Sequence, residues 1–218
     1  HPEFLGFNDS SMIKQADVVL LDYPLQVKPE TKETRRNDLL LYAKLTDPVG
    51  PAMTWMIHSI AFGDIGDDEQ AAEYFHKSTA KYVRSPFFVW HEGANLAGGA
   101  PNFINGAGMH LLSVVAGYGG VRLNLETQEL LLKRPRPPPN CTKLILRRVH
   151  FRGAFLNLEA TDSMWSVALD EPAPAGVTLQ LVSDTIDVGN VTLAYTNGTV
   201  TNPPGSSAMV VQLKTNRR

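Results

Sequence analysis

Apolar residues recur every three to four positions through the first half of the chain, and this period predicts helices. The clearest helix spans residues 68–83, where Asp67 or Asp68 is placed to cap the start. Its apolar face carries Ala71, Tyr74, Phe75, Ser78 and Tyr82. Similar patterns predict helices at residues 34–45, 52–62 and 103–116. The last of these is nearly all apolar or small and is therefore expected to be buried.

After the glycine-rich break at residues 117–120 the period drops to two, which is typical of strands. The alternating apolar positions are Val121, Leu123 and Leu125, then Leu144 and Leu146, Val149 and Phe151, Phe155, Leu156 and Leu158, Trp165 and Val167, Leu179 and Leu181, and Leu193 and Tyr195. Asn197-Gly198 predicts a hairpin turn. We therefore expect an α+β chain with a helical domain at residues 1–120 and an antiparallel β-sandwich domain at residues 121–218.

Composition narrows the class of protein. The chain has 218 residues, of which 43% are hydrophobic, so it is long enough to bury a core. Its net charge of −2 argues against a nucleic-acid partner. No window approaches the roughly 18 apolar residues of a membrane-spanning helix. Cys141 is the only cysteine, so it is expected to be a buried free thiol or, alternatively, a link to an upstream segment.

Four glycosylation sequons lean towards a secreted or lysosomal protein, namely those at Asn8, Asn140, Asn190 and Asn197. We expect Asn190 and Asn197 in particular to lie on surface strands or turns and to carry glycans. The first residues, His1-Pro2-Glu3-Phe4, contain neither an initiator methionine nor a signal peptide. The chain is therefore expected to be an internal or matured piece of a longer protein.

One carboxylate, that of Glu92, is a candidate catalytic group. Glu92 directly follows the aromatic run Pro86-Phe87-Phe88-Val89-Trp90-His91 and directly precedes a loop rich in glycine, alanine and asparagine. An acid between aromatic walls is how a sugar-cleaving site presents a general base that activates water. On local pattern alone, a solvated turn glutamate is the favoured explanation of Glu92, since most glutamates beside a glycine are of that kind. Two further segments change that balance.

One of these segments carries polar side chains and the other contains a turn, and both fit a sugar-cleaving site. Lys14, Gln15 and Asp17 stand just before an apolar run, and the turn at residues 46–52 leads into a helix with Trp55 near its start. The motifs, in order along the chain, are HPEF with IKQADVVLLDYPL, then RNDLLLYAKLTDPVGPAMTW, then PFFVWHEGAN with NFINGAG and GYGG. Together they resemble the C-terminal part of glycoside hydrolase family 65, in its acid trehalase-like branch. The resemblance is strong over residues 1–120 and loose beyond them.

This resemblance implies a fold and a partner. The first domain resembles the last part of an (α/α)6 barrel, and the second resembles the β-domain that follows that barrel. The N-terminal portion of the same precursor, or a second chain, is expected to complete the barrel. Without it, the helical half should expose apolar residues, including faces of residues 18–21 and 103–115.

The resemblance also implies a reaction, namely inverting hydrolysis of an α-glucosidic bond without a cofactor. The substrate classes are trehalose, kojibiose-type glucosides and glucosylgalactosyl-hydroxylysine. Glu92 matches the general base, while the general acid has no counterpart among residues 1–218. Lys14 and Gln15 match a pair that hydrogen-bonds the glucose hydroxyls. Asp17 is expected to orient Lys14 or a backbone amide.

Trp55 and Trp90 are expected to wall the sugar pocket, although isolated tryptophans are more often core residues. Two other readings stay open. One is a non-catalytic carbohydrate-binding or structural glycoprotein, and the other is a phosphorylase. His58-Ser59 imitates a phosphate site, but its place inside a helix favours packing. His110 has no metal-ligand spacing around it, so no metal site is predicted.

Overall fold

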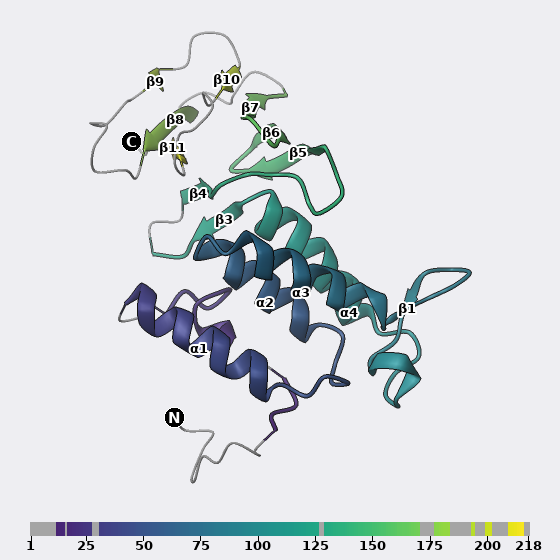
Figure 1. The fold of residues 1–218 in the computed structure, drawn as a ribbon. Helices are drawn as coiled ribbons and strands as arrows, with labels where there is room; N and C mark the ends of the chain where they lie inside the picture. Colours follow the sequence, from purple (N-terminus) through teal and green to yellow (C-terminus); the bar gives the residue numbers. More distant parts are fainter. Residues whose placement is uncertain are drawn as a thin grey trace. The chain divides into compact units, whose positions relative to one another are not determined.

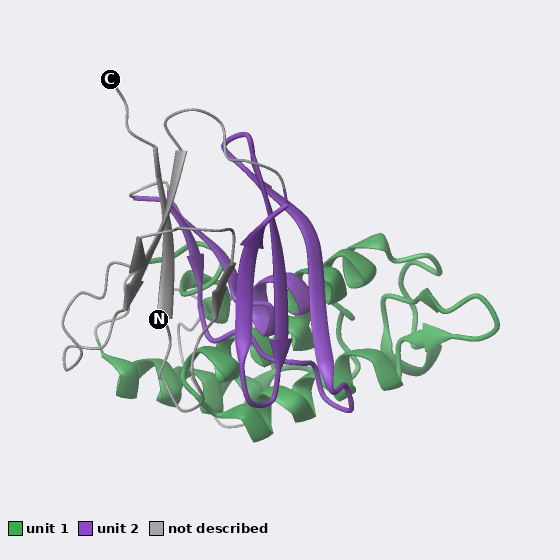
Figure 2. Ribbon diagram, turned by 90° about the horizontal axis from the view of Figure 1, so that it is seen from above, with its two compact units in different colours: residues 1–113 green, residues 114–218 purple. Residues whose placement is uncertain are grey.

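The computed structural model divides the chain into two compact units, residues 1–113 and residues 114–218 (Figure 2). The structure describes residues 12–15, 17–27, 31–126 and 129–170, together with the strand backbones of residues 177–183, 193–194, 199–201 and 209–215. The predicted boundary, at residues 120 and 121, falls slightly later along the chain than this division. Each unit is described by itself below.

Unit 1 is mainly helical (Figure 1). Its elements are the 3-10 turn η1 (Val18–Leu21), α1 (Lys32–Leu45), α2 (Thr54–Asp64), α3 (Asp68–Ala80), the short strands β1 (Val83–Arg84) and β2 (Val89–Trp90), the 3-10 turn η2 (Ala94–Leu96) and α4 (Ile104–Leu112). The helices predicted at residues 34–45, 52–62 and 68–83 are confirmed, with ends shifted by a few residues. The third helix stops at Ala80, so Tyr82 lies just beyond it.

Side-chain caps explain where two of these helices begin. The Oγ1 atom of Thr31 accepts a hydrogen bond from the backbone N–H of Thr34 at 3.0 Å. The Oδ1 atom of Asp67 accepts one from the N–H of Gln70 at 3.2 Å, which confirms one of the two predicted caps. Such side-chain oxygens satisfy backbone donors that have no partner within the helix.

Helix α2 forms the centre of unit 1. Every residue from position 54 to position 63 is buried, as expected for a helix that is apolar on all sides. Helices α1, α3 and α4 and the turn η1 all contact it. On the α3 side, the ring of Tyr74 stacks on Phe62 at 5.3 Å and on Trp55 at 5.6 Å. The aromatic residues of two successive helices therefore make up much of this core.

The segment at residues 103–116 departs from its prediction. It is α-helical only as far as Leu112 and continues as a π-helical turn, Ser113–Tyr118. Ile104 is 80% exposed and Leu111 is 65% exposed, so the prediction of a buried helix is wrong for this chain. Within unit 1, α4 contacts α2 and β2, which cover only part of its apolar circumference. The expected exposure of apolar residues on this segment is confirmed.

The turn η1 was expected to expose apolar residues as well, and here the outcome is mixed. Val18 and Val19 are buried in the core of unit 1, whereas Leu21 is 40% exposed. The described helices are all too short or too polar to cross a bilayer.

Unit 2 contains antiparallel strands, as predicted. They are β3 (Val121–Asn124), β4 (Glu129–Leu132), β5 (Lys143–Phe151), β6 (Ala154–Thr161), β7 (Trp165–Leu169), β8 (Val177–Ser183), β9 (Leu193–Ala194), β10 (Thr199–Thr201) and β11 (Met209–Thr215). The described pairings give a β3–β4 hairpin, a sheet in the order β10-β7-β6-β5 and a sheet in the order β11-β8-β9. The predicted hairpin turn at residues 197–198 lies outside the described residues.

Alternation along the strands is confirmed in β6 and β7. Leu156 and Leu158 are buried on one strand, and Trp165 and Val167 are buried on the next. Leu158 and Val167 are direct partners in the antiparallel register. Cross-strand neighbours on one face are what stabilise such a sheet.

Strand β3 reverses its predicted orientation. Arg122 is only 7% exposed, whereas Leu123 is 47% exposed and Leu125 is 57% exposed. The Arg122 guanidinium turns inward because it donates to the backbone carbonyl of Ala116, at the π-helical turn. The Ala116 carbonyl needs a hydrogen-bond donor, and Arg122 supplies it. This requirement, rather than the alternation of apolar residues, therefore decides which side of β3 is buried. Cys141 is exposed, so its predicted burial is also wrong.

Candidate functional site

The turn at residues 46–52 holds the segment that carries Lys14 and Gln15. Ile13 donates its N–H to the Leu45 carbonyl at 2.9 Å, and Asp47 donates to the Ile13 carbonyl at 2.8 Å. The next residue, Lys14, lies against Gly50. A Cβ atom on Gly50 would lie 2.6 Å from the Lys14 carbonyl oxygen, so only glycine fits this approach. The turn therefore fixes the backbone from which both polar side chains extend.

The same turn also holds the segment that carries Glu92. Ala52 donates its N–H to the Glu92 carbonyl at 2.8 Å, and Ala94 donates to the Val49 carbonyl at 3.3 Å. The two segments predicted to form the site, almost eighty residues apart in sequence, are thus bound to one turn of seven residues. No sequence pattern predicted this role for the turn.

Glu92 begins a loop that closes on itself. Its N–H donates to the Ala100 carbonyl at 3.0 Å, and the Ala100 N–H donates back to Glu92 Oε2 at 2.9 Å. The Gly93 N–H donates to the Gly98 carbonyl at 3.2 Å. The Glu92 side chain is only partly covered, so its carboxylate is held by the backbone and still reaches solvent. These are the properties that a water-activating base needs.

Trp90 lies on β2, two residues before Glu92. Its ring is half-buried beside the His110 ring, with 5.2 Å between the ring centroids. Gly106 of α4 makes room for it, because a Cβ atom there would lie 2.5 Å from Trp90 Cδ1. Among the residues that the structure describes, the buried indole Nε1 has no hydrogen-bond partner. Trp90 is thus packed between the hairpin and α4.

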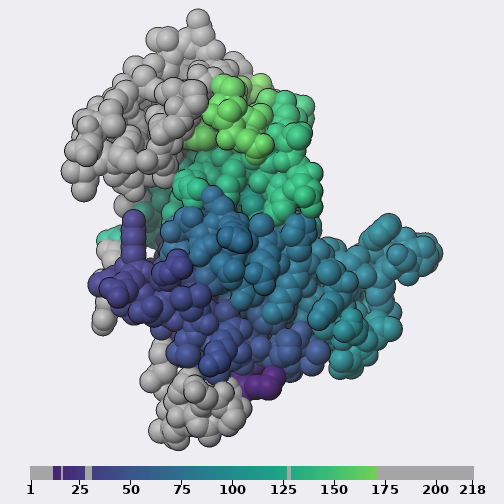
Figure 3. Space-filling view, viewed as in Figure 1, coloured from purple at the N-terminus to yellow at the C-terminus, as the bar shows by residue number. Residues whose placement is uncertain are grey.

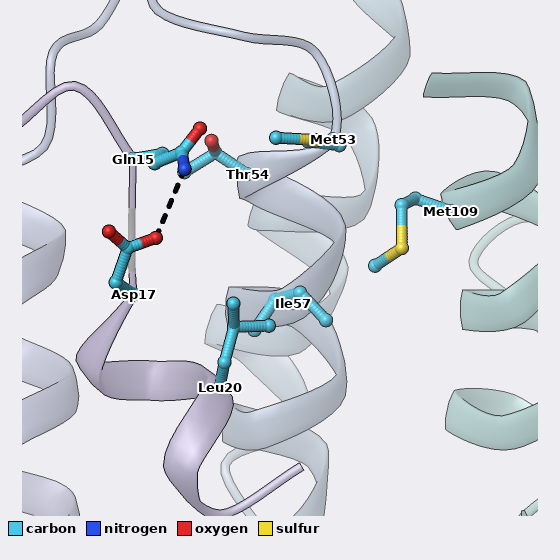
Figure 4. A pocket seen from close by; sticks show the side chains of 7 residues that line it. All are labelled: Gln15, Asp17, Leu20, Met53, Thr54, Ile57 and Met109. Carbon is cyan, nitrogen blue, oxygen red and sulfur yellow. Dashed lines mark hydrogen bonds between the residues drawn. The ribbon is translucent and has the colours of Figure 1, made fainter. Parts of the chain in front are cut away.

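Gln15 and Asp17 pair with each other. Gln15 Nε2 donates to Asp17 Oδ1 at 3.1 Å, as Figure 4 shows. The prediction that Asp17 orients Lys14 or a backbone amide is therefore replaced by this side-chain pair. Lys14 itself is exposed. The pair orients the Gln15 amide, because one of its two N–H donors is engaged by Asp17.

A pocket of about 170 Å³ opens beside this pair (Figure 4). Its lining is mostly apolar and consists of Gln15, Asp17, Leu20, Met53, Thr54, Ile57 and Met109. The Thr54 hydroxyl is buried and has no hydrogen-bond partner among the described residues. Of the residues predicted to bind or cleave a sugar, Gln15 lines this pocket, whereas Lys14, Trp55, Trp90 and Glu92 do not.

Trp55 lies in the core of unit 1 rather than at the rim of a pocket. It is 1% exposed, and its Nε1 donates to the Tyr82 hydroxyl at 2.9 Å. The Tyr82 hydroxyl donates in turn to the Gly50 carbonyl at 3.0 Å. On its other side, the Lys77 ammonium lies 3.5 Å from the centre of the Trp55 ring. Trp55 therefore anchors α2 to the turn at residues 46–52.

His58 and Ser59 are packing residues, as the sequence favoured. His58 is fully buried, and its Nδ1 donates to the Thr54 carbonyl at 3.2 Å. The Ser59 hydroxyl donates to the Ala71 carbonyl at 2.7 Å, which joins α2 to α3. Neither group is available to a phosphate. The pKa of His58 is lowered to about 4, mainly by burial; the hydrogen bond to Thr54 opposes this shift, and the nearby Lys77 charge adds to it.

This buried histidine makes stability depend on pH. Below pH 6.5 the unfolded chain protonates His58, whereas the folded chain does so only near pH 4, so stability falls as the pH falls through that window. The expected loss is about 3 kcal/mol at pH 4. His58→Gln should flatten the pH dependence of the unfolding midpoint in the full-length protein. His76→Gln, on the exposed side of α3, is the control and should leave it unchanged. An equally steep dependence in His58→Gln would contradict this assignment.

The similarity of this chain to known proteins points to one family of enzymes. No protein-family model matches it. A zebrafish (Danio rerio) protein named protein-glucosylgalactosylhydroxylysine glucosidase is 36% identical over 215 residues, which is 98% of this chain. A cell wall acid trehalase of Arthroderma benhamiae is 34% identical over 72% of the chain, and a kojibiose hydrolase of Flavobacterium johnsoniae is 33% identical over 51%. The chain is homologous to the C-terminal parts of glycoside hydrolase family 65 proteins.

A solved structure of a family 65 neighbour supports the fold. A putative kojibiose phosphorylase from the human microbiome matches 73% of this chain and 20% of its own, with a TM-score of 0.54 at 16% sequence identity. The chain spans 31% of the zebrafish glucosidase, 16% of the fungal trehalase and 16% of the bacterial kojibiose hydrolase. This chain therefore corresponds to less than a third of each of these family 65 relatives.

Among the described residues, no three histidine, cysteine, aspartate or glutamate side chains gather closely enough to hold an ion. His110 instead packs against the rings of Phe75 and Trp90, and burial lowers its pKa. The residues that sequence reasoning missed are Gly50, Thr54 and Tyr82. Their roles come from contacts between distant segments, which leave no local signal.

Proposed function

We propose that this chain is the C-terminal part of an inverting α-glucoside hydrolase in which Glu92 is the general base. The observation that carries the proposal is the placement of the Glu92 carboxylate. It is partly exposed, it is held by the Ala100 N–H, and its backbone is bound to the turn that also holds Lys14 and Gln15. The relatives named above are hydrolases of α-glucosides, which supports the same class of reaction.

In this proposal Glu92 accepts a proton from the attacking water, on the face of the sugar opposite to the leaving group. A general acid from the N-terminal portion of the protein protonates the leaving oxygen, and the two carboxyl groups lie about 6.5–9.5 Å apart to leave room for the water. Lys14 and Gln15 bind sugar hydroxyls, since an ammonium donates and an amide both donates and accepts. The reaction needs no cofactor.

We further propose that unit 1 is the last part of an (α/α)6 barrel and that unit 2 is a β-sandwich domain. The N-terminal portion of the same protein is the proposed partner. Its contact would cover apolar side chains that this chain exposes, among them Ile104 and Leu111 of α4. Exposed apolar residues of this size on a helix commonly mark a surface that another segment covers.

Hydrolysis is favoured over phosphorolysis on two grounds. Phosphorolytic members of the resembled family lack a base at the position of Glu92, whereas this chain has one. The His58-Ser59 pair, which imitated a phosphate site in the sequence, is buried in helix contacts. A non-catalytic carbohydrate-binding protein is the remaining alternative, and the experiment below separates all three.

The test uses the full-length protein with kojibiose, trehalose and glucosylgalactosyl-hydroxylysine as separate substrates. Glucose release without added phosphate is expected from at least one of them. Proton NMR should show the cleaved glucosyl unit first as β-glucose because the mechanism inverts its anomeric carbon, whereas the second glucose of trehalose leaves as the α-anomer. Initial release of α-glucose from glucosylgalactosyl-hydroxylysine, or of α-glucose alone from trehalose, would contradict inversion. Release of glucose 1-phosphate only with phosphate would make the protein a phosphorylase, and binding without turnover would make it a non-catalytic protein.

We also propose that the protein is secreted; a lysosomal location is the alternative. The fungal relative is named as a cell wall enzyme, which fits secretion. Of the sequon asparagines, Asn140 is described and is exposed in a turn with a φ of 64°, where a glycan has room. Asn8, Asn190 and Asn197 lie outside the described residues.

A further inference from the structure

The loop at residues 92–100 contains a device that fixes the Glu92 carboxylate. We infer that Gly99 and the backbone N–H of Ala100 position this carboxylate for catalysis, Gly99 by leaving space for it and Ala100 by donating a hydrogen bond. The inference rests on the proposed function of Glu92. It assigns a positioning role to residues that do not contact the substrate themselves.

The first line of evidence is the pair of bonds between Glu92 and Ala100. The backbone of Glu92 donates to Ala100, and Ala100 donates to the Glu92 carboxylate, at 3.0 and 2.9 Å. The backbone and the side chain of Glu92 are therefore both bonded to the same residue, which leaves the side chain little freedom to change rotamer. Because Oε2 accepts the Ala100 N–H, Oε1 keeps its lone pairs for a proton from water.

The second line of evidence is the contact of Gly99 with the same side chain. Gly99 has a φ of +85°, and a Cβ atom there would lie 2.7 Å from both Cβ and Oε2 of Glu92. It would also lie 2.9 Å from Glu92 Cδ. Real Cβ atoms do not approach other atoms this closely, so any side chain at position 99 has to push the carboxylate away from the Ala100 N–H.

The third line of evidence is that both ends of the loop are anchored. At its start, the Ala52 N–H holds the Glu92 carbonyl. After its end, the Phe103 N–H donates to the Trp90 carbonyl at 2.8 Å, and the Arg84 guanidinium donates to the Pro101 carbonyl. The hairpin and loop project from the helices of unit 1 in Figures 1 and 3. These bonds keep the projecting segment from relaxing to admit a side chain at position 99.

The loop itself provides a matched control. Gly98 has nearly the same backbone conformation, with a φ of +90°, but a Cβ atom there meets nothing within 4 Å. Gly98→Ala and Gly99→Ala therefore impose the same left-handed conformation on alanine. They differ in that Gly99→Ala also places a methyl group against the Glu92 carboxylate.

The experiment measures both variants in the full-length enzyme. Gly99→Ala should lower kcat by about 10²-fold, since a displacement near 1 Å of a catalytic group has that effect, while KM changes by less than about threefold. Gly98→Ala should retain kcat within about threefold. Equal kcat values for the two variants would overturn the inference.

Sodium azide distinguishes a displaced base from general damage. Azide needs no deprotonation, so it can attack the anomeric carbon from the face the water would occupy. A C–N bond forms, the glycosidic C–O bond breaks, and the general acid protonates the leaving oxygen to give a β-glucosyl azide. Azide should accelerate Gly99→Ala and Glu92→Gln but not Gly98→Ala. A slow Gly99→Ala enzyme that azide does not accelerate would contradict the positioning role.

Two further measurements cover misfolding and failure of the underlying proposal. If Gly99→Ala unfolds at a lower temperature than Gly98→Ala, Ala100→Pro is used instead, because proline removes the N–H donor and leaves Gly99 in place. Ala100→Pro should show the same loss of kcat and the same response to azide, and wild-type kcat in that variant would overturn the inference. Full turnover in Glu92→Gln would refute the proposed function, whereas the Gly99 results alone bear on the positioning.

Discussion

Glu92→Gln is expected to lower kcat of the full-length protein by about 10²–10⁴-fold, the usual contribution of a general base. Glutamine keeps the shape of the side chain, and its amide oxygen still accepts the Ala100 N–H. It cannot take a proton from water at any working pH, so chemistry slows while substrate binding persists. Steady-state kinetics should show the loss in kcat, and calorimetric titration should show a Kd within about threefold of wild type.

Glu73→Gln is the matched control for this substitution. Glu73 is an exposed glutamate on α3, and the same loss of charge there should leave kcat unchanged. A Glu92→Gln enzyme with wild-type turnover would remove Glu92 from the reaction. A variant that no longer binds substrate would instead make Glu92 a binding residue.

Trp55→Ala is expected to reduce the stability of the full-length protein by about 3–5 kcal/mol. The substitution would leave a cavity under the Tyr74 ring, remove the partner of the Lys77 ammonium and take away the donor to the Tyr82 hydroxyl. Urea unfolding followed by intrinsic fluorescence should show the transition of the helical unit at a lower concentration. Low expression of soluble protein is the corresponding result in cells.

Trp55→Phe separates packing from hydrogen bonding. It keeps an aromatic ring against Tyr74 and removes the indole N–H, so its expected cost is about 1–2 kcal/mol. Unchanged unfolding in Trp55→Ala together with a large rise in KM would show that Trp55 acts on the substrate and that its burial is incidental.

The helical half was readable from sequence because its periods and caps are local. The pattern at residues 68–83 and the capping Asp67 both lie within one element, and both predictions are confirmed. The predicted burial of Leu123 was wrong for the opposite reason. Its side is set by Arg122, which turns inward to reach the Ala116 carbonyl, and that demand comes from outside the strand. The predicted burial of α4 was wrong because the sequence of a helix does not specify which other segments cover it.

The candidate site divides in the same way. Glu92 and Gln15 could be predicted as site residues because their short motifs resemble those of a known family. Trp55 belongs to an equally good motif, yet it lies in the core. A motif specifies the residue type but does not specify whether the side chain faces a pocket or the core. Gly99 had no signal of its own. Its importance depends on one contact with a side chain seven positions earlier, and only the folded loop creates that contact.

The turn at residues 46–52 couples the two segments of the proposed site. Because Gly50 abuts Lys14 and Ala52 bonds to Glu92, any shift of this turn moves Lys14 and Glu92 together. Substitutions in the turn and at either segment should consequently show strong epistasis, with combined effects smaller than the product of the single ones. Selection for a new substrate would then have little freedom here and would act mainly on residues whose backbone is independent of this turn.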